Sequence, residues 1–217
     1  MNEKYIQFFE GLKKNNTREW FQQNKESYQN EVKKPFLSLL ETLITELKKT
    51  DPEICMKANE CLFRINRDLR FSKDKTPYHT LLKAGISPGG RRSELPGFYL
   101  GIGAHTVHVG GGLMNVNSSA LKRVRALIAE DLDIFLSIVN DPCFISAFET
   151  VKGEKAKRLD KSLRQIAEET PYIANKQFYV MQQLPLSDYL YGDKLINRVL
   201  KSFQTILPFN QFLRKAF

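Results

Sequence analysis

The sequence has few cysteines and no long apolar run. Its three cysteines, Cys55, Cys61 and Cys143, are odd in number and show no Cys-x-x-Cys spacing. A disulfide framework and a zinc site are therefore not indicated, and we expect small buried side chains. No stretch approaches the roughly 18 to 20 apolar residues of a membrane span, and the N-terminus lacks the layout of a signal peptide. These absences predict a cytoplasmic protein with no membrane partner.

Common catalytic and cofactor motifs are also missing. The glycine run Gly110–Gly112 has no Walker lysine beside it and fits no dinucleotide fingerprint, although glycines between a strand and a helix can approach a phosphate. No Gly-x-Ser-x-Gly elbow is present. His79, His105 and His108 show no metal-ligand spacing. We therefore predict no metal and no cofactor, and the sequence leaves open whether the protein is an enzyme.

The composition is that of a folded, basic protein. With 217 residues and a hydrophobic fraction of 42%, the chain can bury one core, so we predict a single domain over residues 1–217. Its formal net charge of +9 would attract phosphates, nucleic acid or anionic head groups. Many of the lysines lie on predicted helix faces, where a solvated surface is the simpler interpretation.

Apolar residues recur at helical spacing near both ends of the chain. The expected helices run from Asn16 or Thr17 to Val32, from Pro35 to the break at Asp51-Pro52, from Ser118 to Val139, from Pro142 through Phe148, and from Asp193 to Ile206. A proline removes a backbone donor, so Pro208 should end the last of these, with a short C-terminal helix beyond it.

The middle of the chain alternates with the two-residue period of strands. The expected strands are residues 61–71, Leu81–Ser87, Phe98–Gly103, Thr106–Gly110 and Gln177–Leu184. Several of them follow one another through short links, which favours antiparallel pairing. The predicted fold is therefore α+β, an antiparallel sheet meander flanked by N-terminal and C-terminal helices.

One polar segment, residues 64–83, carries the strongest functional signal. On a strand, Arg64, Asn66, Asp68 and Arg70 would share a face about 20 Å long at roughly 3.3 Å per residue. Guanidinium groups at such spacing can bind phosphate or carboxylate. The turn after Phe71 would add backbone N–H groups and lysines. The predicted ligand-binding residues are Arg64, Arg67, Asp68, Arg70, Ser72, Lys73, Lys75, Tyr78 and Lys83, and the predicted partner is an anionic small molecule.

Two other interpretations of this segment stay open. Nucleic-acid binding is suggested by the net charge and by the aromatic residues Phe71, Tyr78 and Tyr99 near the basic residues. Alternatively, the segment is structural, with Asp68 and Asp74 pairing with neighbouring cations. Arg67 would fall on the apolar face of the strand, where it must pair internally or be turned outward by a bulge. Tyr78 could stack on a ligand or simply hold the turn.

The run from Arg64 to Tyr78, RINRDLRFSKDKTPY, resembles the hallmark of an uncharacterised, mainly bacterial family known as a domain of unknown function. The resemblance extends to Asn15–Phe21, Pro96–Tyr99, Gly110–Gly112 and the Gly-Glu-Lys at 153–155. It implies a shared fold over most of the chain and supplies no reaction. This chain departs from the pattern at His79, where a basic residue is more common, and at Leu159-Asp160-Lys161, which replaces a turn with proline and glycine.

Overall fold

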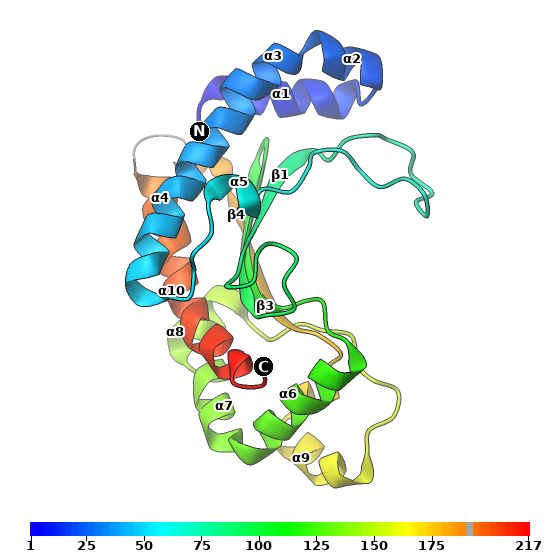
Figure 1. The fold of residues 1–217 in the computed structure, drawn as a ribbon, viewed down its shortest axis with the longest axis vertical. Helices are drawn as coiled ribbons and strands as arrows, with labels where there is room; N and C mark the ends of the chain where they lie inside the picture. Colours follow the sequence, from blue (N-terminus) through cyan, green and yellow to red (C-terminus); the bar gives the residue numbers. More distant parts are fainter. Residues whose placement is uncertain (190–192) are drawn as a thin grey trace.

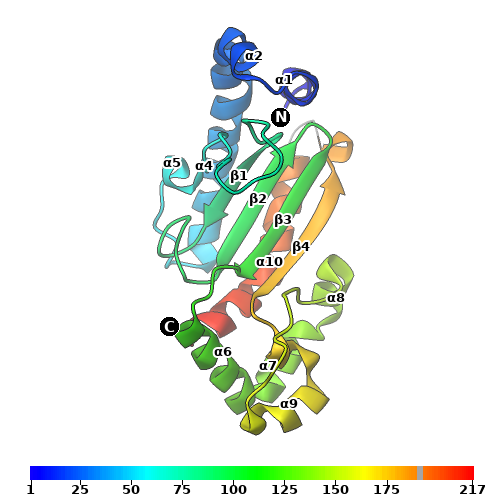
Figure 2. The same cartoon turned by 90° about the vertical axis from the view of Figure 1, so that its right-hand side faces the viewer.

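A four-stranded antiparallel sheet lies at the centre of the protein. The computed structural model describes residues 1–189 and 193–217. The strands are β1 (Leu81–Ile86), β2 (Gly97–Gly103), β3 (Thr106–Leu113) and β4 (Phe178–Pro185). They lie side by side in the order of the sequence, each antiparallel to its neighbour (Figure 2). The predicted α+β class and antiparallel meander are confirmed.

Helical segments near the N-terminus lie at one end of the sheet and along its back (Figure 1). They are α1 (Glu3–Lys14), α2 (Arg18–Gln23), α3 (Lys25–Ser27), the π-helix η1 (Tyr28–Lys33), α4 (Lys34–Thr50) and the short α5 (Ala58–Cys61). Thr17 caps α2 by accepting a hydrogen bond from the Trp20 amide, as the sequence indicates. Pro35 lies inside the α-helical run that follows η1. The π-helix η1 ends just before Pro35, whose backbone nitrogen has no hydrogen to donate to the preceding turn.

The remaining helices follow β3 and β4. They are α6 (Ser118–Glu130), α7 (Leu132–Val139), α8 (Pro142–Phe148), α9 (Arg164–Glu169), α10 (Lys194–Arg214) and the 3₁₀ turns η2 (Lys161–Leu163), η3 (Pro171–Ala174) and η4 (Leu186–Tyr189). The prediction that Pro208 ends the last helix is wrong, because α10 continues through it to Arg214. Phe209, Phe212 and Leu213 beyond the proline are buried, and this packing outweighs one lost backbone hydrogen bond.

Helices α4 and α10 cover one face of the sheet (Figures 1 and 2). Alternate strand residues, such as Phe98, Leu100 and Val109, are fully or almost fully buried on this covered face. Gly111 lets α10 approach closely, since a Cβ there would lie 2.7 Å from the Cγ2 atom of Ile206. The Asn210 side chain donates to the Gly97 carbonyl oxygen at 3.0 Å. The covered face is thus a conventional apolar core.

The last turn of α10 is tied to the end of α4. Arg214 donates to a carboxylate oxygen of Asp51 at 2.8 Å and to Glu53 at 3.1 Å. The Asp51 side chain is only 2% exposed. A buried carboxylate needs such a partner, because removing the arginine would leave the negative charge of Asp51 uncompensated in the interior. This ion pair joins elements that are far apart in the sequence.

The predicted strand over residues 61–71 is wrong. Only isolated bridges occur there, between Leu62 and Ala84 and between Asn66 and Tyr78. Residues 62–80 instead form an irregular arm that projects from the sheet (Figure 1). Polar side chains bind its backbone groups: the Asp74 carboxylate accepts from the Thr76 amide, and the Asp68 carboxylate from the Arg70 amide. These local turns compete with a regular ladder.

The prediction of buried cysteines holds for one of the three. Cys61 is buried, and burial raises its thiol pKa to about 11, while Cys55 and Cys143 are exposed. Among the described residues, no helix has both the length and the apolar character needed to cross a membrane.

Candidate functional site

The second face of the sheet carries no helix layer (Figure 2). Residues on this open face alternate with the core residues of each strand. They include Lys83 on β1, Tyr99 on β2 and Tyr179 on β4. Between them lie glycines, so the centre of the open face holds few side chains. A sheet face without side chains at its centre leaves room for a ligand.

Two of these glycines leave little room for a side chain. Gly101 lies opposite Lys83, and a Cβ at this position would come within 3.0 Å of the Tyr99 hydroxyl oxygen and 2.8 Å of Leu81. Gly112 has a φ of +111°, which disfavours residues with a side chain, and a Cβ there would lie 2.2 Å from the Phe178 carbonyl oxygen. The glycine run Gly110–Gly112 is part of β3, which continues beyond its predicted end at Gly110 to Leu113.

The arm is fixed at its base by the N-terminal helices. The Asn16 side chain both donates to the Tyr78 carbonyl oxygen, at 2.9 Å, and accepts from the Tyr78 amide, at 3.1 Å. The Tyr78 ring stacks on Phe21 with centroids 4.1 Å apart. Tyr78 is buried, so it holds the arm in place, the second of the two roles considered for it.

Polar side chains fix the tip of the arm internally. The Arg67 guanidinium donates to the Asp74 carboxylate, to both oxygens of Thr76, and to the Ser72 hydroxyl. Lys75 donates to the Leu69 carbonyl oxygen at 3.1 Å. Arg67 thus pairs internally, as one interpretation of the sequence required. These hydrogen bonds hold the tip of the arm together.

Asp68 pairs with Arg70 at the edge of the arm. Arg70 donates to the two carboxylate oxygens at 3.0 and 2.7 Å. These hydrogen bonds lower the pKa of Asp68 to about 2. Bonds from the Thr76 amide and Arg67 lower the pKa of Asp74 to about 2 as well. Both groups are therefore carboxylates at neutral pH, too weakly basic to act as general bases.

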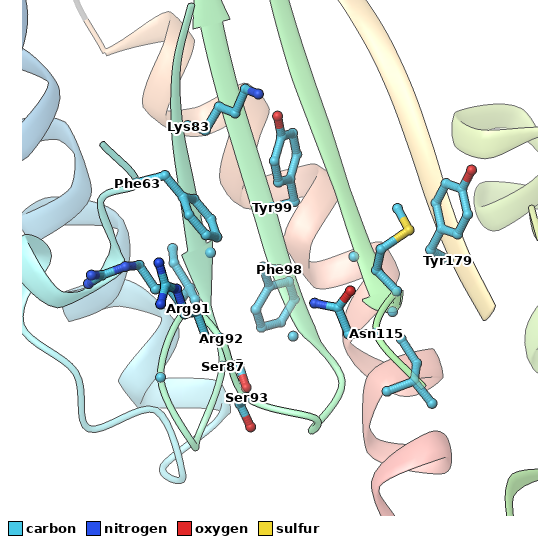
Figure 3. Close-up of a pocket in the computed structure, with 18 of the residues that line it drawn as sticks. Phe63, Lys83, Ser87, Arg91, Arg92, Ser93, Phe98, Tyr99, Asn115 and Tyr179 are labelled. Carbon is cyan, nitrogen blue, oxygen red and sulfur yellow. The ribbon is translucent and has the colours of Figure 1, made fainter. Parts of the chain in front are cut away.

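A cavity of about 610 Å³ lies between the arm, the open face and the loop after β1. Its polar side chains include four cations, Arg64, Lys83, Arg91 and Arg92, against the single carboxylate of Asp68. Phe63, Tyr99 and Tyr179 supply aromatic surface. Figure 3 shows Lys83 and Tyr99 at one end of the cavity, and Arg91 and Arg92 beside Phe63.

The cations differ in how they are held. Arg91 donates to the Glu60 carbonyl oxygen at 2.6 Å and so fixes the loop. Arg64 and Arg92 make no side-chain hydrogen bond or ion pair with the described residues. Lys83 contacts the His79 Nδ1 atom at 3.2 Å. None of these four cations pairs with a described carboxylate, so the cavity is electropositive.

The pKa values of Lys83 and His79 respond to this environment. Burial lowers the pKa of His79 to about 4, with further lowering by the positive charges of Lys83, Arg67 and Arg64. The imidazole is therefore neutral near pH 7. Burial, together with Arg67, also lowers the pKa of Lys83. Both groups are held in an environment that disfavours added positive charge.

The structure divides the predicted binding residues into three groups. Those lining the cavity are Arg64, Asp68 and Lys83. Those holding the arm are Arg67, Arg70, Ser72, Lys75 and Tyr78, and Lys73 is exposed at the tip. Sequence reasoning missed Arg91, Arg92, His79 and Tyr179 as cavity residues. The turn Pro88-Gly-Gly-Arg-Arg92 was the available signal, since it places two arginines at the end of a predicted strand.

The histidines and acidic residues do not assemble into a metal site. Within residues 1–189 and 193–217, no group of three or more His, Cys, Asp or Glu side chains could hold a metal ion. His108 contacts the Thr106 hydroxyl at 3.1 Å, and His105 lies 3.1 Å from Glu10. His79 lies in the cavity and neither of the others lines it.

Comparison with known proteins identifies the family of the chain. Several segments that carry the resemblance are distant in sequence and meet at the arm or the open face. Asn16 and Phe21 contact Tyr78 at the base of the arm. Tyr99 and Gly112 line the cavity. No curated protein and no solved structure matches the chain. One family model covers residues 4–212. The chain therefore belongs to the family described as conserved hypothetical protein (DUF2461).

Proposed function

We propose that the protein binds a small anionic ligand, bearing a phosphate or a carboxylate, in the cavity on the open face of the sheet. The observation that supports this is the imbalance of charge. Arg64 and Arg92 face the cavity without partners among the described side chains, and the carboxylate of Asp68 is already bound by Arg70. A guanidinium group binds phosphate or carboxylate through paired N–H donors.

The cavity also suggests the size and shape of the ligand. Its volume of about 610 Å³ lies within the roughly 300–1,000 Å³ typical of small-molecule sites. The aromatic surfaces of Phe63, Tyr99 and Tyr179 favour a ligand with an apolar or planar body beside its anionic group. Such a ligand would be met in the cytoplasm, the location expected from the sequence.

Thermal unfolding with and without ligands tests this proposal. We expect phosphate esters and carboxylates to raise the Tm, since a ligand at 100 times its Kd stabilises a protein by about 2.7 kcal/mol. The double variant Arg64→Ala/Arg92→Ala should lose this shift. Lys73→Ala is a matched control, because it removes an exposed cation of the arm that does not line the cavity.

Two outcomes would contradict the proposal. An equal shift in the wild type and the double variant would place the anion elsewhere. If no anion raises the Tm of the wild type, and Arg64→Ala/Arg92→Ala only lowers the Tm, a purely structural role for the arm is favoured.

Nucleic-acid binding is a second candidate, supported by one observation at the tip of the arm. Phe71 is 95% exposed, and the Arg70 guanidinium lies 5.8 Å from its ring centroid. An exposed aromatic residue among cations can stack on an unpaired base. Affinity for a single-stranded oligonucleotide should then fall steeply with salt and be weakened by Phe71→Ala. Salt-independent or absent binding would exclude this candidate.

A further inference from the structure

Lys83 is unusual among the cations of the cavity. The residue is half-buried, and its side chain lies at the end of the cavity where the Tyr99 hydroxyl also lies (Figure 3). The one hydrogen-bond partner of Nζ among the described residues is the His79 Nδ1 atom, at 3.2 Å, and no described carboxylate lies within 4.0 Å of it. Most lysines at a surface are solvated or paired with acids, whereas this one is aimed into a pocket beside a neutral base.

The surroundings of Lys83 lower the pKa of its ammonium group. Burial is the main cause that lowers the pKa of Lys83, and the positive charge of Arg67 on the arm lowers it further. Burial also lowers the pKa of His79, with smaller contributions from Lys83, Arg67 and Arg64. Tyr99 faces the same space from β2, and its own pKa is raised by burial. A lysine that is desolvated and close to other cations has more of the neutral amine at pH 7, and only that form is a nucleophile.

We propose that Lys83 forms an imine with the ligand, so that the cavity binds a carbonyl compound that also bears an anionic group, such as a phosphorylated aldehyde or a 2-oxo acid. This inference rests on the proposed anion binding. Arg64 and Arg92 would bind the anionic group, and the carbonyl carbon would lie at Lys83.

The chemistry needs no further reactant. The ammonium of Lys83 first loses a proton to water, and the amine nitrogen then attacks the carbonyl carbon to form a C–N bond. The nitrogen then gives up one proton and the carbonyl oxygen takes one up, which gives a neutral carbinolamine. Loss of that oxygen as water leaves a C=N bond, so amine and carbonyl compound become imine and water. Water carries the protons in these steps, and the His79 Nδ1 atom orients the Lys83 nitrogen when it accepts from it.

Reductive trapping tests the proposal. The full chain is incubated at pH 7 with pyridoxal 5′-phosphate, an aldehyde that bears a phosphate, and the imine is reduced with borohydride to a stable secondary amine. Peptide mass spectrometry then gives the extent of labelling at each lysine. Pyridoxal is the matched probe, because it has the same aldehyde without the phosphate.

We expect labelling at Lys83 to be at least about tenfold faster than at the exposed Lys73, which corresponds to roughly 1.4 kcal/mol. The phosphate-bearing probe should exceed pyridoxal at Lys83, and Arg64→Ala/Arg92→Ala should remove that difference. Lys83→Arg keeps the charge and should abolish the adduct. Equal labelling of Lys83 and Lys73, or no effect of the phosphate, would overturn the proposal.

The two proposals fail in different ways. If anions raise the Tm of the wild type but Lys83 is not preferentially labelled, the imine is excluded and anion binding stands. If no anion raises the Tm, the proposed function itself fails, and any labelling of Lys83 reflects a reactive amine without an anion site.

Discussion

The two faces of the sheet are built from the same four strands and serve different purposes. On β2, Phe98, Leu100 and Ile102 point to the covered face and are buried under the helices. The intervening positions are Gly97, Tyr99, Gly101 and Gly103. Because neighbouring residues of a strand point to opposite faces, one strand supplies both a packed core and the floor of a cavity. Glycine at alternate positions makes the difference.

The largest effect should come from truncating neighbouring residues of β2 on opposite faces. Phe98 packs against Phe203, with ring centroids 4.8 Å apart. We expect Phe98→Ala to lower the free energy of unfolding by about 3–5 kcal/mol. Tyr99→Ala should lower it by only about 1 kcal/mol while weakening ligand binding. Chemical denaturation measures both. Equal losses would show that the open face is also part of the stabilising core.

A smaller effect should follow from detaching the arm. Asn16→Ala removes both hydrogen bonds to the Tyr78 backbone, which should destabilise the arm by about 1–3 kcal/mol. Amide hydrogen exchange should become faster at Arg67 and His79, whose amides donate to the facing arm segment, and stay unchanged in β2. Asn15→Ala is the control, because the side chain of Asn15 is exposed and bonds only within its own turn. If both variants behave alike, Asn16 does not hold the arm.

The last effect is the dependence of the arm on pH. The folded pKa of His79 is about 4, below the roughly 6.5 of an unfolded chain. The unfolded state therefore binds the proton first, and stability is lost as pH falls from about 6.5 to 4. Asp68 and Asp74, with pKa values of about 2, add a second loss between roughly pH 4 and 2. NMR titration of the arm should show both steps.

Asp74→Asn separates these two steps. It should reduce the loss between about pH 4 and 2, while the pKa of His79 stays below its ordinary value because burial, its main cause, is unchanged. A His79 imidazole that titrates near its ordinary value would instead show that the cavity is well hydrated, and it would weaken the contrast between the two faces.

The sequence predicted the sheet better than the arm. Regular alternation over β1, β2, β3 and β4 gave four strands, because burial on one face imposes a two-residue period. The same alternation over residues 61–71 did not give a strand. There the carboxylates of Asp68 and Asp74 bind nearby amides, and these local turns replace the ladder. Alternating polarity predicts a strand only where a neighbouring strand can pair with it.

The candidate site was predicted in part. Arg64, Asp68 and Lys83 were singled out and line the cavity, since cations gathered in one segment remain close in space. Arg67 and Tyr78 came from the same segment and hold the arm instead. Arg92 and Tyr179 reach the cavity from other parts of the chain, and no local pattern connects them with residues 64–83.

The sequence by itself determined the α+β class, the order of the strands and the position of the polar segment, because these follow from periodicity and charge along the chain. The tertiary structure decided which face of the sheet the helices cover and where the arm folds. It also decided which cations are left without partners. Those features depend on contacts between distant residues, such as Asn16 with Tyr78 and Arg214 with Asp51, and such contacts form only when the whole chain packs.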